Sequence, residues 1–188
     1  MPITHTSRTG KRYYLHTGPK RGGGTQYFLS TKPTEPLADK VPDGFEIHET
    51  VNGQVYLRRR PPELIRAEEQ EFLQRRLPPS KGGTRYQIEV SGESVILHES
   101  ASDSRVFTEL ASHLSVQEQE RISERFAHYQ PIMRFILTDA ERRFFAPERY
   151  CFRGSVDDWI SIGSPAQLKT VVTRYFKHLG KDSFYELY

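Results

Sequence analysis

The chain of 188 residues contains one cysteine and one tryptophan, and it has no acidic residue before position 35. A single cysteine excludes an internal disulfide and any zinc site built from several thiolates. No apolar run approaches the roughly 20 residues that cross a bilayer, and the first residues lack the apolar core of a secretory signal. We therefore expect a cytoplasmic protein with no membrane partner.

Signatures of cofactor and metal binding are also missing. The glycine run at 22–24 lies between two strand patterns. A Walker loop needs Gly-x-x-x-x-Gly-Lys-Ser/Thr, and a dinucleotide fingerprint leads from a strand into a helix. The seven histidines are scattered without the spacing of a metal site. We predict no cofactor and no bound metal.

Aromatic residues make up 12% of the chain, which favours a packed core rich in strands over disorder. Two strand patterns, at 12–16 and 25–30, flank the glycine-rich loop and indicate a hairpin. A second hairpin is predicted around Asn52-Gly53, because a type I′ turn needs positive φ at both central residues. That turn would place Glu46 opposite Arg59.

The middle of the chain predicts a helix and then a linker. Residues 63–76 are good helix formers with acids early and arginines late, which matches the helix dipole. Residues 78–83 are rich in proline and glycine and mark a boundary. The expected organisation is an antiparallel β module at 11–60, a helix and linker at 61–84, and a second domain at 85–188.

The second domain reads as α+β. A hairpin turns at Ser91-Gly92, and Ser115 with Glu118 forms a capping box at a helix start. Strands follow near 132–137, 144–152 and 159–162. Pro147 makes the second of these an edge or bulged strand, because proline cannot donate to a ladder.

The last helix is the strongest pattern in the sequence. Ser164 serves as its cap, Pro165 as its first residue, and Gly180 stops it. Its apolar stripe consists of Leu168, Val171, Val172, Tyr175, Phe176 and Leu179. The fold class is therefore α+β: a small antiparallel β-hairpin module, then an α+β domain with an antiparallel sheet and a C-terminal amphipathic helix.

Residues 148–165 gather the rarest residue types of the chain. Cys151 lies between aromatic residues in a strand pattern, which favours a buried structural cysteine over a nucleophile. Asp157 and Asp158 offer carboxylates for a metal, but a clamp with Arg149 and Arg153 is the favoured interpretation. We accordingly predict a structural joint rather than an active site.

An enzyme remains the alternative. The order helix, three strands, helix across 115–179 resembles the core order of the restriction-endonuclease-like nucleases, whose third strand carries Glu-x-Lys. The resemblance implies Asp139 and Glu148 as metal-binding carboxylates, although Tyr150 stands where the motif has lysine. A metal-dependent nuclease or hydrolase would use these residues or Asp157 and Asp158.

The N-terminal cations carry the leading hypothesis. A basic stretch without acids indicates an anionic partner, and neighbouring aromatic side chains offer stacking faces. We expect a non-catalytic module whose hairpins contact nucleic acid or another polyanion. The predicted contact residues are Lys11, Arg12, Lys20, Arg21, Arg58, Arg59 and Arg60. A protein-interaction scaffold that uses the same aromatic faces, or Phe184, Tyr185 and Tyr188, is the second alternative.

Overall fold

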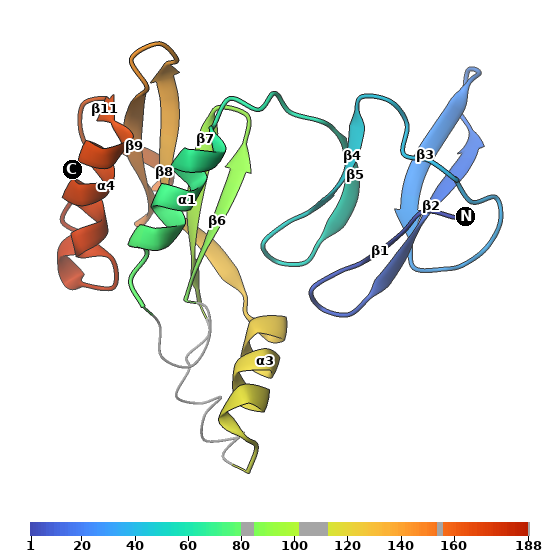
Figure 1. Ribbon diagram of the computed structural model, residues 1–188, viewed down its shortest axis with the longest axis horizontal. Coiled ribbons are helices and arrows are strands. Elements are labelled where there is room, and N and C mark those ends of the chain that lie inside the picture. The colour runs from blue at the N-terminus through green and yellow to red at the C-terminus, as the bar shows by residue number, and fades with distance from the viewer. Residues whose placement is uncertain (80–84, 102–112, 154–155, 188) are drawn as a thin grey trace.

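A computed structural model describes residues 1–79, 85–101, 113–153 and 156–187. Strands β1 to β5 form an N-terminal module at one end of the long axis. The sheet of β6 to β11, with its covering helices, forms the other end (Figure 1). The chain is α+β, as predicted, with antiparallel sheets and a C-terminal helix.

The N-terminal module consists of two small antiparallel sheets. Strands β1 (Thr4–Thr6), β2 (Arg12–Pro19) and β3 (Thr25–Ser30) form the first, in that order. Strands β4 (Phe45–Glu49) and β5 (Val55–Arg59) form the second. Both predicted hairpins are present, and β1 adds a strand that the sequence pattern did not reveal.

The register of the β4–β5 hairpin differs from the prediction. Glu46 pairs with Arg58, and Arg59 lies opposite Phe45. Thr50 donates its N–H to Gln54 and accepts the N–H of Gly53, so three residues form the loop instead of two. Such loops join a type I turn to one left-handed residue, here Gly53 with φ 75°, and so shift the pairing by one position.

The C-terminal sheet is an antiparallel meander in the order β10-β9-β8-β7-β6. It consists of β6 (Tyr86–Ser91), β7 (Ser94–Ser100), β8 (Tyr129–Asp139), β9 (Phe144–Arg153) and β10 (Val156–Ser161). The short strand β11 (Ala166–Gln167) pairs with β9 beyond the end of β10. Helix α3 (Val116–Phe126) precedes β8, and Ser115 with Glu118 forms the predicted capping box.

Strand β9 is an interior strand, so of the two alternatives predicted from Pro147, an edge or a bulge, the edge is wrong. The β8–β9 pair does shift register, between Leu137 and Asp139 on β8. β8 pairs with one side of β9, and β10 and β11 pair with the other. The carbonyl of Pro147 accepts the N–H of Ile162, where the chain leaves β10 and crosses to β11. The missing N–H of proline faces the same side, because both groups of one residue point together in an antiparallel strand. No ladder bond of the β8 side is lost.

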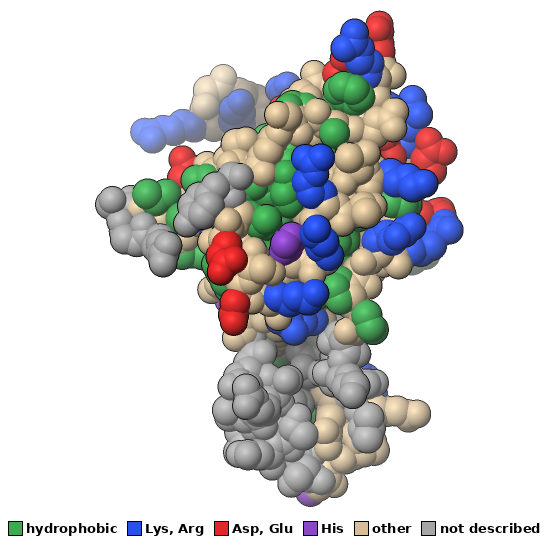
Figure 2. All heavy atoms as spheres, turned by 90° about the vertical axis from the view of Figure 1, so that its left-hand side faces the viewer, with side chains coloured by type: hydrophobic (Ala, Val, Ile, Leu, Met, Phe, Trp, Pro, Cys, Tyr) green, Lys and Arg blue, Asp and Glu red, His purple; other side chains and the backbone are tan. Residues whose placement is uncertain are grey.

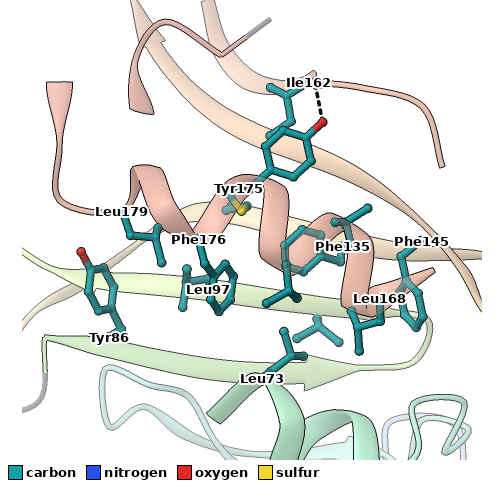
Figure 3. Close-up of a cluster of buried hydrophobic side chains, with 14 of the residues drawn as sticks. Leu73, Tyr86, Leu97, Phe135, Phe145, Ile162, Leu168, Tyr175, Phe176 and Leu179 are labelled. Atoms are coloured by element: carbon teal, nitrogen blue, oxygen red, sulfur yellow. Dashed lines mark hydrogen bonds between the residues drawn. The ribbon is translucent and has the colours of Figure 1, made fainter. Parts of the chain in front are cut away.

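Helices α1 (Ala67–Arg76) and α4 (Leu168–Tyr175) cover one face of the C-terminal sheet (Figure 1). Every residue of the predicted apolar stripe is buried. Figure 3 shows the stripe packed with Leu73, Tyr86, Leu97, Phe135 and Phe145 of the opposing elements. This single core unites residues from 65 to 184 in sequence.

Both helix starts lie later than predicted. Helix α1 begins at Ala67, because Glu69 accepts the backbone N–H of Arg66 and so caps the helix there. Helix α4 begins at Leu168, because Ala166 and Gln167 pair with β9. Beyond α4, the 3₁₀ turns η1 (Phe176–His178) and η2 (Asp182–Phe184) flank Gly180 at φ 71°.

The outer surfaces carry mixed charge. On the side of α4, lysine and arginine side chains are interspersed with acidic and apolar ones (Figure 2). Within the described ranges, no helix has the length and apolar character needed to cross a bilayer.

Candidate anion-binding cleft

An open cleft of about 1110 Å³ lies between the N-terminal module and the edge of the C-terminal sheet. One wall comes from the β1–β2 turn and the β4–β5 hairpin. The other comes from β6, α3 and the start of β8. The lining residues are Arg8, Gly10, His48, Glu49, Thr50, Val51, Arg58, Gln87, Ile88, Glu89, Val90, Arg121, Arg125 and Tyr129.

Four arginines converge on this cleft: Arg8 from the β1–β2 turn, Arg58 from β5, and Arg121 and Arg125 from α3. Arg121 and Arg125 are exposed, and their spacing of four places them on one side of α3. Arg125 donates Nε to the carbonyl of Thr9, which ties α3 to the β1–β2 turn. Arg8 donates Nη2 to the carbonyl of Ala127, and Arg58 pairs with Glu46 at 2.9 Å. These contacts position Arg8, Arg58 and Arg125, and those of Arg58 and Arg125 leave further guanidinium N–H donors.

The two acids of the cleft are both engaged by basic groups. Glu49 accepts from His5 Nε2 and from the backbone N–H of Arg8, each at 2.6 Å. Glu89 lies between two histidines, with His48 Nε2 at 3.3 Å and His98 Nε2 at 3.1 Å. His98 lowers the pKa of the Glu89 carboxyl below its usual value, against the opposing effect of burial. With four arginines against these two acids among the lining residues, the charge offered to a ligand is mainly positive.

The two walls of the cleft are joined by the side-chain amide of Asn52, which bonds to both backbone groups of one residue, as a neighbouring strand would. Asn52 donates Nδ2 to the carbonyl of Tyr129 at 2.9 Å and accepts the N–H of Tyr129 at 2.7 Å. His48 reaches Glu89 across the same junction. These contacts fix the β4–β5 hairpin against the C-terminal sheet and give the cleft a defined width.

The structure separates the seven cations predicted from the sequence. Only Arg58 lines the cleft. Lys11 and Arg12 lie at the start of β2, whereas Lys20 and Arg21 follow its other end, about 23 Å away for eight residues of strand. Arg59 and Arg60 are exposed, and Arg60 lies 3.9 Å from Glu46.

Cys151 and the paired aspartates of residues 148–165 lie outside the cleft. Cys151 is half-buried on β9, opposite Asp158 of β10. Asp157 and Asp158 are exposed on consecutive positions of a strand, so their side chains point to opposite faces. Such an arrangement does not present both carboxylates to one ion.

The predicted arginine clamp is wrong for Arg149. This residue is 6% exposed, and its guanidinium donates to the carbonyls of Leu187 and Tyr150 instead of to an aspartate. Its position on the core face of β9 directs it toward the C-terminal tail, away from β10. The side chain of Arg153 lies outside the described residues.

The carboxylates implied by the nuclease resemblance do not converge. Asp139 ends β8 and accepts the N–H groups of Glu141 and Arg142, as a turn residue does. Glu148 pairs with Arg134 at 2.5 Å, roughly 16 Å along the ladder from Asp139. Among the described residues, no three His, Cys, Asp or Glu side chains are placed to hold one metal ion.

The aromatic residues considered for a scaffold role are only partly accessible. Phe184 is 5% exposed and belongs to the core, whereas Tyr185 is 65% exposed. Tyr188 lies outside the described residues. In the N-terminal module Phe28 and Tyr56 are exposed, but Phe28 stacks on His16 and Tyr56 contacts His48 edge-on.

The sequence did not point to Arg8, Arg121, Arg125 or the His48–Glu89–His98 cluster as a site. The four-residue spacing of the α3 arginines was visible after the capping box, but the opposing surface comes from residues 8–10, 48–58 and 87–90, far earlier in the chain. Comparison with known proteins identifies no relative: no family model matches the chain, and no curated protein or solved structure matches it.

Proposed function

We propose that the protein is a non-catalytic binding module that holds an anionic segment of another macromolecule in the cleft. The observation that carries this proposal is the convergence of Arg8, Arg58, Arg121 and Arg125 on a cleft with two acids, Glu49 and Glu89, each of which contacts a histidine. Charge-assisted hydrogen bonds from arginine are the strongest that a protein offers to carboxylates and phosphates.

The dimensions of the cleft favour a segment of a polymer over a compact ligand. Its volume of about 1110 Å³ exceeds the ~300–1,000 Å³ of pockets for small molecules. A second hollow of about 290 Å³ shares Arg58 and Val90 with it and extends past Gly92. The two hollows meet at Arg58 and Val90, which leaves room for a bound chain to continue past the end of β6.

A binding titration at several salt concentrations tests the proposal. Fluorescently labelled polyglutamate and labelled single-stranded oligonucleotides serve as probes of the two main classes of polyanion. We expect at least one probe to bind at low salt with an affinity that falls as salt screens the arginines.

Charge reversal at Arg121 locates the site. Arg121→Glu should weaken binding about tenfold or more, since charge-assisted contacts are worth roughly 1.5–3 kcal/mol. Arg142→Glu is the matched control, because Arg142 is likewise an exposed arginine but lies on the β8–β9 turn. Absence of binding at low salt, or equal loss in both variants, would reject the proposal.

A further inference from the structure

Strand β6 is an edge strand of the C-terminal sheet, and its unpaired side lies in the arginine-lined cleft. β6 ends the sheet order, with β7 as its partner on one side only. The residues that line the cleft include Ile88 and Val90, whose side chains point to the core, and Gln87 and Glu89, whose side chains point to the opposite face. Because the cleft contacts residues from both faces of β6, it runs along the edge of this strand.

The hydrogen bonds between β6 and β7 show which backbone groups of β6 are left to face the cleft. Ser100 donates its N–H to Arg85, so residues 85, 87, 89 and 91 exchange bonds with β7. The alternate residues of an antiparallel strand point their N–H and C=O away from that partner. Ile88 and Val90 therefore direct both groups into the cleft, and among the described residues nothing pairs with them.

We infer that an extended acidic peptide binds in this cleft by adding a strand to β6. The inference rests on the proposed function and names the partner. Main-chain bonds to Ile88 and Val90 would supply the pairing, and alternate side chains of the peptide would face the arginines. Arg121 and Arg125 on α3, and Arg58 on β5, lie around the same edge.

The cleft favours a peptide over a single-stranded nucleic acid. Nucleic-acid grooves of this kind combine cations with aromatic faces on which bases stack. Of the described cleft residues, Tyr129 is the only Phe, Tyr or Trp; it is 2% exposed and has Arg8 over its ring. The cleft thus offers charge and a strand edge without a stacking platform.

The other edge of the same sheet is unsuited to an acidic strand. Strand β10 carries Asp157 and Asp158, both exposed. Their charge would repel an acidic peptide, as edge charges commonly do in sheets that avoid pairing. The two edges are therefore distinguished by charge, and only β6 lies beside the arginines.

Amide hydrogen exchange of the full chain tests the strand addition. The probe is a capped octapeptide of alternating glutamate and valine. On binding, exchange of the Ile88 and Val90 amides should slow about tenfold or more. The amides of Gln87 and Glu89, already bonded to β7, are internal controls and should change little.

N-methylated peptides supply a second measurement that needs no protein variant. Methylation at every second residue removes the N–H groups of one edge of the peptide. One of the two methylated isomers should lose affinity about tenfold or more, and the other should bind nearly as the parent does.

Each outcome separates the two ideas. Peptide binding without slowed exchange at Ile88 and Val90, or equal affinity of both isomers, rejects strand addition and leaves the anionic cleft. Binding of an oligothymidylate that depends on Arg121, with no binding of the peptide, rejects it in favour of nucleic acid. If neither probe binds, the proposed function itself fails.

Discussion

At the scale of single residues, a tyrosine hydroxyl leaves no room for any side chain at position 163, where the chain has glycine. Tyr175 donates its hydroxyl to the carbonyl of Ile162 at 2.8 Å inside the core, as the dashed line in Figure 3 shows. A Cβ at position 163 would lie 2.2 Å from that hydroxyl, with the next ring atom at 3.5 Å. Gly163→Ala should lower the free energy of unfolding by about 2 kcal/mol, as overpacking does.

The cause can be isolated with a double-mutant cycle measured by urea unfolding. In the Tyr175→Phe background the clashing oxygen is gone, so Gly163→Ala should cost less than about 1 kcal/mol. Gly18→Ala is the control, because its Cβ would meet only ordinary contacts. Equal costs in both backgrounds would show that the hydroxyl is not what requires glycine.

Glu89 links the charge of the cleft to pH. Its folded-state pKa is lowered, chiefly because His98 contacts the carboxylate. On acidification the unfolded chain therefore takes up the proton first. The stabilisation is complete above about pH 5 and is lost as the pH falls through the folded-state pKa. Glu89→Gln should flatten this part of the curve of unfolding free energy against pH.

Urea unfolding at pH 6 and pH 4 measures the effect. The wild-type chain should lose more stability between these values than Glu89→Gln does. Glu141→Gln, an exposed change on the β8–β9 turn, should follow the wild type. Parallel curves for all three proteins would contradict the role given to His98.

At the scale of elements, the β4–β5 loop depends on Gly53. This residue has φ 75°, and a Cβ there would lie 3.0 Å from the Thr9 methyl group. Gly53→Ala should cost about 1–2 kcal/mol for the left-handed backbone, and more for the contact with the β1–β2 turn.

Gly44→Ala separates the two contributions. Gly44 has φ 76° and open space around its Cβ position. Its substitution reports the backbone cost alone, measured as the change in unfolding free energy. The Gly53 variant should exceed it by about 1 kcal/mol, and a smaller loss at Gly53 would refute the packing argument.

The elements that the sequence predicted best are those fixed by local periodicity. The stripe of α4 follows from its 3.6-residue spacing, and the hairpins follow from alternation with turn residues. The errors concern pairing between distant segments. Pro147 looked like an edge residue because the residues around it do not reveal that β10 and β11 leave a gap in their pairing with β9 at this position. Similarly, Pro165 looked like a helix start because β11 cannot be recognised in two residues.

At the scale of the whole molecule, polar contacts join the N-terminal module to the C-terminal sheet. Asn52 makes two bonds to the backbone of Tyr129. Asn52→Ala leaves those groups without that partner and should cost about 1–3 kcal/mol. We expect the Tyr129 amide to exchange faster and the N-terminal module to unfold at a lower temperature than the C-terminal sheet.

Calorimetry and hydrogen exchange measure these effects. Thr31→Ala is a suitable control, since Thr31 is an exposed residue after β3, away from the junction. A single unchanged transition, together with unchanged exchange at Tyr129, would show that the junction does not depend on Asn52.

The candidate cleft could not be predicted from the sequence because its walls come from segments that are far apart in the chain. Arg8 belongs to the acid-free N-terminal stretch, but nothing there distinguishes it from the other cations, and Arg121 and Arg125 stand in a helix with nearby glutamates and give no excess of positive charge. Only the fold brings these segments around β6. The strand edge itself is equally hidden, because a pattern of alternation predicts a strand without saying which neighbour it lacks.

The Asn52 contact has a consequence for how the chain can change over generations. Its amide recognises main-chain groups, which every residue except proline presents alike. This contact therefore depends on the side chain at position 52 and very little on the side chain at position 129. Substitutions along the start of β8 could accumulate without loosening it, whereas a change at Asn52 would leave the junction to the contacts of Arg8, Arg125 and His48.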